Sequence, residues 1–368
     1  MRAPSHIGGT HMLLAIAFIV SFFFAMNIGA SGAAASMGVA YGSGAIPRKS
    51  VALLLCGISV FLGSLGGGEV VKTIGSGIIP SSILTVKIVV IILTAATISL
   101  FAANIMGIPL STSEITVGAV VGVGIAYQAV YFNKLLFIVS VWIVIPIIAF
   151  AFTLAVGKWF LALKRKYPQL EQGRWQKTFM TLLIVTGCFE AFSAGMNNVA
   201  NAVGPLVGAG LISVGPATIL GGLSVAAGAL LLGRRVLETN GKKITNFSPF
   251  EGSAISGTGA LLVIISSLFG LPVPLTQITT SAIIGIGTAK SGLSIWQKRI
   301  VVQLLKVWLV SPIFSLVISY SLIKLLLDSD VYTVIAIFSV CLATLGVISL
   351  KKTAVEEERS LHEHGGGI

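Results

Sequence analysis

The stretch Gly195–Pro205, GMNNVANAVGP, decides how the rest of this sequence is read. It places three asparagines within five residues, and long hydrophobic runs lie on both sides of it. A side-chain amide surrounded by hydrocarbon is costly unless it finds hydrogen-bond partners. Three amides so close together therefore indicate either a polar cavity or a buried contact between helices.

The composition of the whole chain indicates a membrane protein. Its 368 residues are 55% hydrophobic and 10% charged, and the mean hydropathy is +0.99. That is too apolar for a soluble protein, and the apolar runs are long enough to cross a bilayer. The net charge is +12, but the basic residues stand in short loops between these runs, which disfavours a nucleic-acid-binding protein. We expect a multi-pass protein of the cell membrane.

A related stretch in the first half indicates an internal duplication. Residues 29–44 read GASGAAASMGVAYGSG, and three of their glycines recur 166 residues later. The matched pairs are Gly38 with Gly204, Gly42 with Gly208 and Gly44 with Gly210. A polar, glycine-broken segment inside the membrane, present once in each half, is the best sequence indication of a transporter binding site.

A second pair of motifs supports the duplication. Residues 107–114, GIPLSTSE, match residues 270–277, GLPVPLTQ, at an offset of 163, which also relates Gly122 to Gly285. The Gly-x-Pro at the start of each motif breaks a helix within an apolar run. Membranes tolerate such a break only where the freed backbone lines a cavity or is buried in protein. The excess of basic residues also switches sides between the halves, as two oppositely oriented repeats would produce.

The predicted fold is an all-α polytopic membrane protein with two inverted-topology repeats, broken or re-entrant helices and about 11–12 transmembrane segments. The sequence allows segments 84–126 and 252–290 to be either full crossings or re-entrant hairpins. The basic loops are placed on the cytoplasmic side. The expected parts are an expression-vector remnant at 1–11, the first transmembrane repeat at 12–157, a basic cytoplasmic connector at 158–177, the second, inverted transmembrane repeat at 178–325, an extra transmembrane helix at 326–350 and a polar tail at 351–368.

The interrupted helices predict an anion site near the middle of the membrane. A helix break leaves unpaired backbone N–H groups and a positive dipole end. Hydroxyl and amide side chains add donors without the dehydration cost of a buried Lys or Arg. Small and polar residues can instead serve only close helix packing, but their pairing across the halves favours the site. The candidate substrate-binding residues are Ser31, Gly32, Ser111, Thr112, Ser113, Asn197, Asn198, Asn201 and Thr276.

Carboxyl groups inside apolar runs are the candidates for proton or ion coupling. Glu114 directly follows a Ser-Thr-Ser sequence, and a buried glutamate is a natural proton carrier or cation ligand. Glu190 is a reserve candidate, and Gln277 occupies the position of Glu114 in the second motif. The alternative for these groups is a structural hydrogen bond to a neighbouring helix. Glu69, three residues before Lys72, is expected in an interfacial ion pair.

Several chemistries are disfavoured by motifs that the sequence lacks. All four histidines lie in the terminal segments, so a serine or cysteine nucleophile within the membrane has no histidine partner. Zinc-ligand spacing and a Walker loop are also absent from the sequence. We expect no enzyme activity, no metal site and no cofactor.

At the two motif pairs the chain resembles the inorganic phosphate transporter (PiT) family of inverted-repeat secondary transporters. That family carries Gly-Ala-Asn-Asp-Val-Ala-Asn-Ala in each half, and residues 195–202 match it except that Asn198 replaces the aspartate. In the first half Gly32 stands at the aspartate position. The family's motif aspartates look like sodium ligands, so their loss disfavours sodium coupling. The whole pattern is similar to the bacterial sulfate-permease branch of the family, in which sulfate import feeds cysteine synthesis.

The sequence therefore predicts a secondary active transporter that imports sulfate across the cytoplasmic membrane together with protons. Sulfate only accepts hydrogen bonds, so a donor-rich site without an aspartate suits it, whereas protonated phosphate can also donate to a carboxylate. The expected partners are the anion, protons and the lipid bilayer, and a homodimer is left open. The alternatives are an inorganic phosphate symporter with the same fold, a passive anion channel and, as the weakest, a membrane-embedded enzyme.

Overall fold

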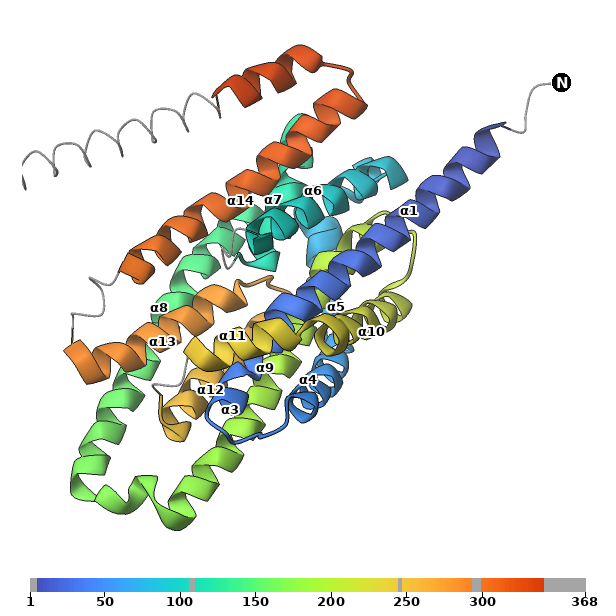
Figure 1. Ribbon diagram of the computed structural model, residues 1–368. Coiled ribbons are helices and arrows are strands. Elements are labelled where there is room, and N and C mark those ends of the chain that lie inside the picture. The colour runs from blue at the N-terminus through green and yellow to red at the C-terminus, as the bar shows by residue number, and fades with distance from the viewer. Residues whose placement is uncertain (1–4, 106–109, 244–246, 293–298, 341–368) are drawn as a thin grey trace, which may run out of the picture. The chain divides into compact units, whose positions relative to one another are not determined.

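The structure is a computed structural model, and it describes residues 5–105, 110–243, 247–292 and 299–340. All regular secondary structure in these ranges is helical (Figure 1). Six helices are long and apolar enough to cross a membrane, and a bent pair adds a seventh. The predicted all-α polytopic membrane fold is thereby confirmed, with several of the remaining apolar segments forming shorter helices. By internal contacts the chain divides into residues 1–319 and 320–368, which are described separately.

The helices differ widely in length, and several short ones stand where long ones are interrupted. The first half contains α1 (Ser5–Ile28), the π-helix η1 (Gly29–Ala33), α2 (Ala34–Ser36), α3 (Gly38–Gly42), α4 (Lys49–Ser64), α5 (Gly68–Lys72), the π-helix η2 (Thr73–Gly77), the 3-10 helix η3 (Ser81–Ile83), α6 (Val86–Ile105), α7 (Thr112–Ala126) and α8 (Phe132–Lys166). The second half contains the 3-10 helix η4 (Pro168–Glu171), α9 (Gly173–Gly208), α10 (Val214–Leu232), α11 (Arg234–Lys243), α12 (Pro249–Leu268), α13 (Leu275–Ser291) and α14 (Arg299–Leu326).

Side chains are distributed as expected for a protein surrounded by lipid. Large apolar residues are exposed on the outer helices, for example Ile143, Ile147 and Phe152 on α8. Amide, hydroxyl and carboxyl side chains are buried between the helices. Because lipid tails are as apolar as leucine, little is gained by hiding leucine from them, whereas polar groups must find partners inside the protein.

The glycine-rich stretch of the first half alters a helix without breaking it at Gly29, where the predicted interruption was expected to begin. α1 passes directly into the π-helix η1 and α2, so residues 11–36 form one continuous helical span, and a turn at Met37 precedes the short helix α3. The chain then turns at Gly44, whose φ of +78° is a conformation that glycine adopts without a steric penalty. α1 itself begins at Ser5, inside the segment 1–11 that was set apart as a remnant.

A similar interruption was predicted at the asparagine motif of the second half, and this prediction is wrong. α9 runs without a break from Gly173 to Gly208, through all three asparagines. Pro205 lies inside α9, but only three residues before its end, where little helix remains to be disturbed. The helix stays intact because the amides bond to groups on other elements and do not compete for the backbone of α9.

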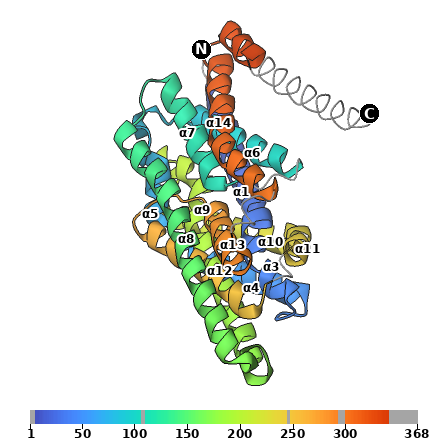
Figure 2. The same ribbon diagram turned by 90° about the vertical axis from the view of Figure 1, so that its left-hand side faces the viewer.

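The basic connector predicted at 158–177 is also mostly helical. α8 continues to Lys166 and α9 begins at Gly173, because Lys and Arg are good helix formers and the helix ends only beside Pro168. α8 has 35 residues and is therefore about 52 Å long, well beyond the roughly 30 Å hydrocarbon core. Figure 2 shows the turn of the α8–α9 hairpin extending past the neighbouring helix ends.

Both Gly-x-Pro motifs lie between two apolar helices. α12 and α13 are joined by a turn at Gly270, whose φ is +70°. α6 and α7 flank the first motif, of which Gly107 and Pro109 lie outside the described residues. α7 has 15 residues, about 22 Å, which is too short for the roughly 30 Å core, and its residues 112–124 are all buried. These features favour a re-entrant hairpin for α6 and α7.

The two halves touch through reciprocal pairs of close contacts. At five of the described glycines an added Cβ would lie 1.9–2.0 Å from a carbonyl oxygen of the other half, so the backbones themselves are in contact, and four of the five form reciprocal pairs. The pairs are Gly29 with Val225, Gly195 with Val60, Gly63 with Phe192 and Gly228 with Met26. An offset of 165 or 166 residues converts each contact into its counterpart. Two repeats related by a two-fold axis produce this reciprocity.

α1 and α9, which carry the matched glycine motifs, run in opposite directions. Ser21 Oγ on α1 donates to Ala202 O at 2.9 Å. Further along, a Cβ on Gly187 would lie 3.5 Å from Ser36 O. Between the first contact and the second, the residue number rises from 21 to 36 in the first half and falls from 202 to 187 in α9. Figure 1 shows the same antiparallel course. Equivalent helices that point in opposite directions are what an inverted topology requires.

The second unit begins within α14 and contains a further helix, Val331–Val340. Lys324 Nζ donates to Asp328 Oδ2 at 2.8 Å, and Thr333 N donates to Asp330 Oδ1 at 3.1 Å, which caps the helix that follows. The extra span predicted at 326–350 is thus described as far as residue 340, and the tail at 351–368 lies outside the described residues.

Candidate functional site

One face of α9 carries the three asparagines of the motif. Asn197 and Asn201 are four residues apart and Asn198 and Asn201 three, so the amides share one side of the helix. Each of these residues is at most 4% exposed. They face the first turn of α7, whose residues Thr112 and Ser113 are also buried.

The hydroxyls of α7 and the amides of α9 form one hydrogen-bond network. Thr112 Oγ1 donates to Asn198 Oδ1, and Ser113 Oγ donates to Asn197 Oδ1, both at 3.2 Å. Asn201 Nδ2 donates to Thr112 Oγ1 at 3.2 Å and to Ser113 Oγ at 3.3 Å. The structure therefore brings five of the predicted binding residues together at the N-terminus of a buried helix. We call these five residues the polar cluster.

Within the polar cluster, Asn197 uses its full hydrogen-bonding capacity. Its Nδ2 donates to Ser267 Oγ at 2.9 Å and to Leu271 O at 3.0 Å. Its Oδ1 accepts from Ser113 Oγ and, at 3.2 Å, from the backbone N–H of Val273. A primary amide has two donors and one acceptor oxygen, so nothing is left for a ligand. Asn197 ties α9 to α7 and to the break before α13.

Asn198 and Asn201 retain unused capacity. Asn201 Oδ1 is buried and has no hydrogen-bond partner. Asn198 Nδ2 lies 3.8 Å from the position that a Cβ on Gly32 would take, so this amide faces the π-helix of the first half across a residue without a side chain. Gly32 has no side chain, so it leaves room beside this amide at the position where the family motif has an aspartate.

The remaining predicted binding residues lie around the polar cluster with different roles. Ser111 is buried and precedes the first residue of α7. Ser31 is half-buried, and its hydroxyl donates back to Asn27 O at 2.9 Å rather than to the cluster. Thr276 is half-buried in the first turn of α13, where its carbonyl accepts from Thr280 Oγ1.

Glu114, the leading candidate for coupling, is buried on α7 and hydrogen-bonded on both oxygens. Gln277 Nε2 on α13 donates to Oε1, and Ser311 Oγ on α14 donates to Oε2. Glu114 and Gln277 are separated by the repeat offset of 163. Equivalent residues of two repeats meet where a two-fold axis passes between them. Gln277 was named from the sequence as a coupling candidate but not as a partner of Glu114, and Ser311 was not named at all.

Glu190 is a second buried carboxyl group, on α9 and 4% exposed. Thr279 Oγ1 on α13 donates to its Oε1 at 2.9 Å. Among the described residues, no ion pair joins Glu114 or Glu190 to a basic side chain. The two intramembrane carboxyl groups are therefore surrounded by neutral donors.

The polar cluster is closed in this structure. Its side chains are buried and bonded to one another. Two cavities lie elsewhere in the molecule. A cavity of about 220 Å³ is lined by Gln176, Phe179, Ser248, Pro249 and Phe250, and one of about 440 Å³ by Ser76, Tyr131, Phe132, Asn133 and Lys134. A substrate could reach the cluster only after the helices around it had moved.

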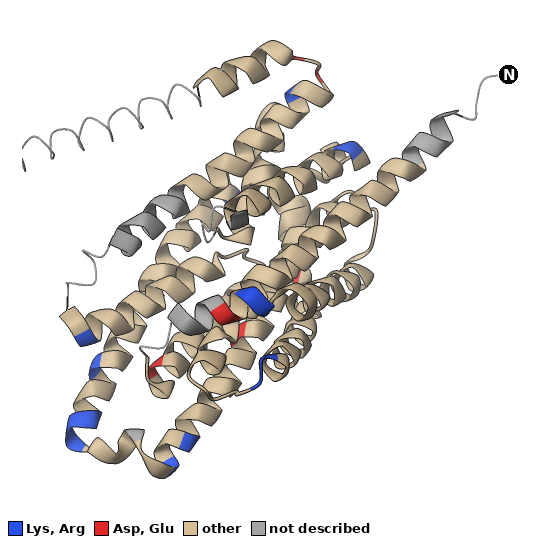
Figure 3. Ribbon diagram, in the orientation of Figure 1, with Lys and Arg blue, Asp and Glu red and all other residues tan. Residues whose placement is uncertain are grey.

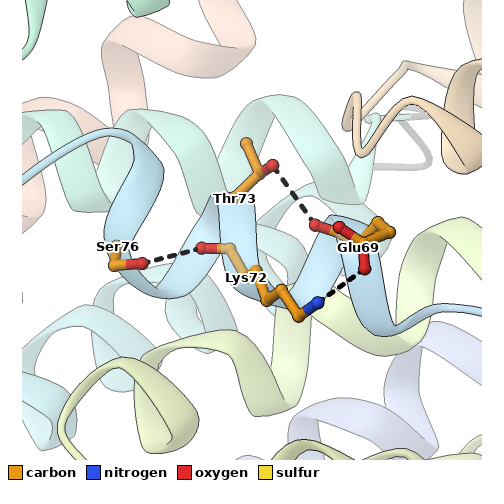
Figure 4. Close-up of polar contacts among 4 residues, drawn as sticks. All are labelled: Glu69, Lys72, Thr73 and Ser76. Atoms are coloured by element: carbon orange, nitrogen blue, oxygen red, sulfur yellow. Dashed lines mark hydrogen bonds and ion pairs between the residues drawn. The ribbon is translucent and has the colours of Figure 1, made fainter.

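The other acidic residues form ion pairs near helix ends. Lys72 Nζ donates to Glu69 Oε1 at 2.6 Å, and both side chains are more than half exposed, so the expected interfacial pair is present (Figure 4). The same figure shows hydroxyls of the next turn bonded to the helix backbone. Lys49 bonds to Glu238 across α4 and α11, and this bond holds the pKa of Glu238 below its ordinary value.

The matching motifs, the helical fold and the buried donors point to one protein family. The sequence pattern of the phosphate transporter family matches residues 28–319, which contain both motif pairs and the whole polar cluster. The chain belongs to this family. It is therefore a multi-pass transporter of anions in the cell membrane and not an enzyme.

Two individual proteins show how far the likeness to this family extends. The sulfate permease CysP of Bacillus subtilis (strain 168) is 61% identical over 353 residues, which cover 96% of this chain and 99% of that protein. A solved structure described as the sodium-dependent phosphate transporter matches with a TM-score of 0.71 and 25% sequence identity, covering 86% of this chain and 100% of that chain. The membership in the family and the polytopic helical fold are thus both confirmed.

Proposed function

We propose that this transporter imports sulfate across the cytoplasmic membrane together with protons. The observation that carries the proposal is the buried polar cluster at the N-terminus of α7, whose hydrogen bonds within the described part of the chain join amides, hydroxyls and backbone groups and no charged side chain. Such a site binds a desolvated anion through hydrogen bonds and the positive end of a helix dipole. The relative with 61% identity, named a sulfate permease, supports the same substrate.

The donors around the site suit an anion that carries no proton. Sulfate only accepts hydrogen bonds, and a free carboxylate beside it would repel it. Glu114 follows Ser113 in the chain, but both of its oxygens are already engaged by Gln277 and Ser311. Asn198 replaces the aspartate of the family motif, so an amide stands where a second negative charge would otherwise lie.

Phosphate is the alternative substrate, and one observation favours it. Asn201 Oδ1 is a buried acceptor without a partner. A protonated phosphate can donate a hydrogen bond to this oxygen, whereas sulfate cannot. For sulfate to use the same side chain, the amide must turn its Nδ2 towards the anion. The name of the family and that of the solved structure also keep phosphate in consideration.

Coupling and movement are assigned to the broken helices. Glu114 carries a proton in the proposed cycle, since it is a buried carboxyl next to the polar cluster. Alternating access comes from the α6–α7 and α12–α13 hairpins moving against the rest of two inverted repeats. The reciprocal glycine contacts and the antiparallel course of α1 and α9 support these repeats.

Counterflow in proteoliposomes tests this function. Vesicles loaded with unlabelled sulfate should take up labelled sulfate, and excess external phosphate should leave most of this uptake in place. An inward proton gradient should drive accumulation above equilibrium without sodium. If excess phosphate abolishes the uptake of labelled sulfate, phosphate is the substrate. If accumulation strictly requires sodium, protons are not the coupling ion. If sulfate never accumulates above equilibrium, the protein is a passive channel.

A further inference from the structure

Glu190 occupies a site of its own between three helices. Thr279 on α13 donates to its Oε1 at 2.9 Å. On α12, a Cβ at Gly259 would lie 3.7 Å from the same oxygen. Ser256 stands three residues before Gly259, on the same side of α12, and its hydroxyl is buried beside this carboxyl group. The carboxyl group is therefore enclosed by a donating threonine, a glycine and a buried serine hydroxyl.

No positive charge neutralises this carboxyl group in the described part of the chain. The charged residues of the two helices that face it are Glu251 on α12 and Lys290 on α13, which bond to each other at 3.0 Å. Glu114 is likewise met by the neutral side chains Gln277 and Ser311. A carboxylate buried without a cation is strongly disfavoured, so each group must exchange its charge with something that enters the site.

Both buried carboxyl groups are bonded to one short piece of α13. Gln277, which holds Glu114, and Thr279, which holds Glu190, are two residues apart and follow directly after the break that precedes this helix. Movement of the α12–α13 hairpin would therefore change the surroundings of both carboxyl groups in one step.

The carboxyl group at position 190 is not a requirement of the repeated architecture. The residue 166 positions earlier is Phe24, which is fully buried. The counterpart of Thr279, 163 positions earlier, is Thr116, whose buried hydroxyl has no partner. The first half thus keeps the hydroxyl but lacks the acid, so the second half carries an additional titratable group.

We propose that Glu190 is a second proton carrier and that each cycle moves two protons with one sulfate, an inference that rests on the proposed function. Sulfate brings two negative charges and the protons two positive ones, so no net charge crosses the membrane. When the empty carrier opens to water, both glutamates are carboxylates. In the loaded carrier both are acids and the dianion takes over their charge. Like charges repel, so the dianion and the two carboxylates replace each other.

The number of protons moved per sulfate is measured in proteoliposomes as the ratio of internal to external sulfate that a given proton gradient can sustain. With the membrane potential clamped at zero, a gradient of one pH unit should sustain about 100-fold accumulation of labelled sulfate for two protons and about tenfold for one. A potassium diffusion potential, negative inside, should leave uptake by the unaltered protein unchanged. A tenfold limit, or uptake slowed by that potential, would overturn the two-proton cycle whatever the variants show.

Variants assign the second proton to its residue. Glu190→Gln and Glu114→Gln should each lower the limit from about 100-fold to about tenfold and make uptake sensitive to the potential, because one negative charge then crosses per cycle. The control Glu69→Gln removes an exposed carboxyl group and should keep the ratio of two. A Glu190→Gln protein that still holds about 100-fold accumulation would place the proton elsewhere.

Two further measurements keep the inference distinct from the proposed function. When sulfate is added to the purified protein in weak buffer, each chain should take up two protons. Glu190→Gln or Glu114→Gln should take up one, so a variant that no longer transports is still informative. A folded Glu190→Gln protein that binds no sulfate would make Glu190 a sulfate-binding residue and contradict the inference. Loss of sulfate counterflow in the unaltered protein would instead contradict the proposed function itself.

Discussion

At the scale of single residues, Asn197 and Asn201 differ although they belong to one motif and one helix face. Asn197 makes four hydrogen bonds. One reaches α7, and three reach the end of α12 and the turn that follows it. Asn201 donates from its Nδ2 only, and its Oδ1 has no partner. The first residue holds the site together, and the second has capacity left for a substrate.

Replacement of the two asparagines by leucine separates these roles. Asn197→Leu leaves the N–H of Val273 and the O–H of Ser113 without an acceptor and the carbonyl of Leu271 without a donor, at about 1–3 kcal/mol for each buried group. We expect a clearly lower thermal unfolding temperature in detergent. Asn201→Leu strands no donor, so the unfolding temperature should hardly change while sulfate binding weakens by about 10- to 100-fold, the worth of one hydrogen bond to an anion.

Thermal unfolding followed by fluorescence and sulfate binding measured on the same preparations check both variants. Equal loss of stability in the two proteins would show that Asn201 is as structural as Asn197. Normal sulfate affinity in a stable Asn201→Leu protein would remove Asn201 from the binding site.

The membership of the polar cluster was predictable at this scale, but its partners were not. Hydroxyls and amides in apolar runs indicate buried polar contacts, and Thr112, Ser113 and the asparagines do bond to one another. Ser267 and Ser311 stand outside both motifs, and nothing in the sequence shows that they face Asn197 and Glu114. Their roles depend on how distant helices meet, which no local pattern records.

At the scale of helices, the same sequence signals had two structural outcomes. In the first half the helix changes to a π-helix at Gly29 and ends at Ser36, within the glycine-rich stretch, yet α9 continues through the asparagine motif. The difference lies in the partners: the amides of α9 are bonded to α7 and to the turn before α13, so the backbone of α9 keeps its own hydrogen bonds. Sequence alone cannot distinguish a break from a polar helix face, because both need glycine and hydrogen-bonding side chains.

The close glycines of the paired helices predict a symmetric response to substitution. Gly195→Ala places a methyl group 2.0 Å from Val60 O, and Gly29→Ala places one 1.9 Å from Val225 O. Each should separate the backbones at a cost of about 1–3 kcal/mol, as overpacking does. Gly215→Ala, at a position with nothing within 4 Å, is the matched control and should be neutral. Thermal unfolding temperatures of the three variants provide the comparison, and a destabilised control or a neutral Gly195→Ala would contradict the direct backbone contact.

At the scale of the whole molecule, the basic residues mark one end of the helical body. Lys and Arg gather around the turn between α8 and α9, at the end where α13 finishes and α4 begins (Figure 3). The basic loops predicted the cytoplasmic side from charge alone, and the structure adds that one continuous helix, α8, links this end to the opposite one. What the charge pattern missed is the helical form of the connector, because loop charge carries no information on backbone conformation.

Cysteine labelling of the two ends of α8 tests the orientation. Asn133 near its start and Gln169 just past its end are both exposed. A background without native cysteines is made by replacing Cys56, Cys188 and Cys341 with serine or alanine. In right-side-out vesicles a membrane-impermeant maleimide should label Asn133→Cys only, and in inside-out vesicles Gln169→Cys only, because the basic end is retained in the cytoplasm. Labelling of both positions from one side would mean that α8 does not cross the bilayer, and the reverse pattern would invert the topology.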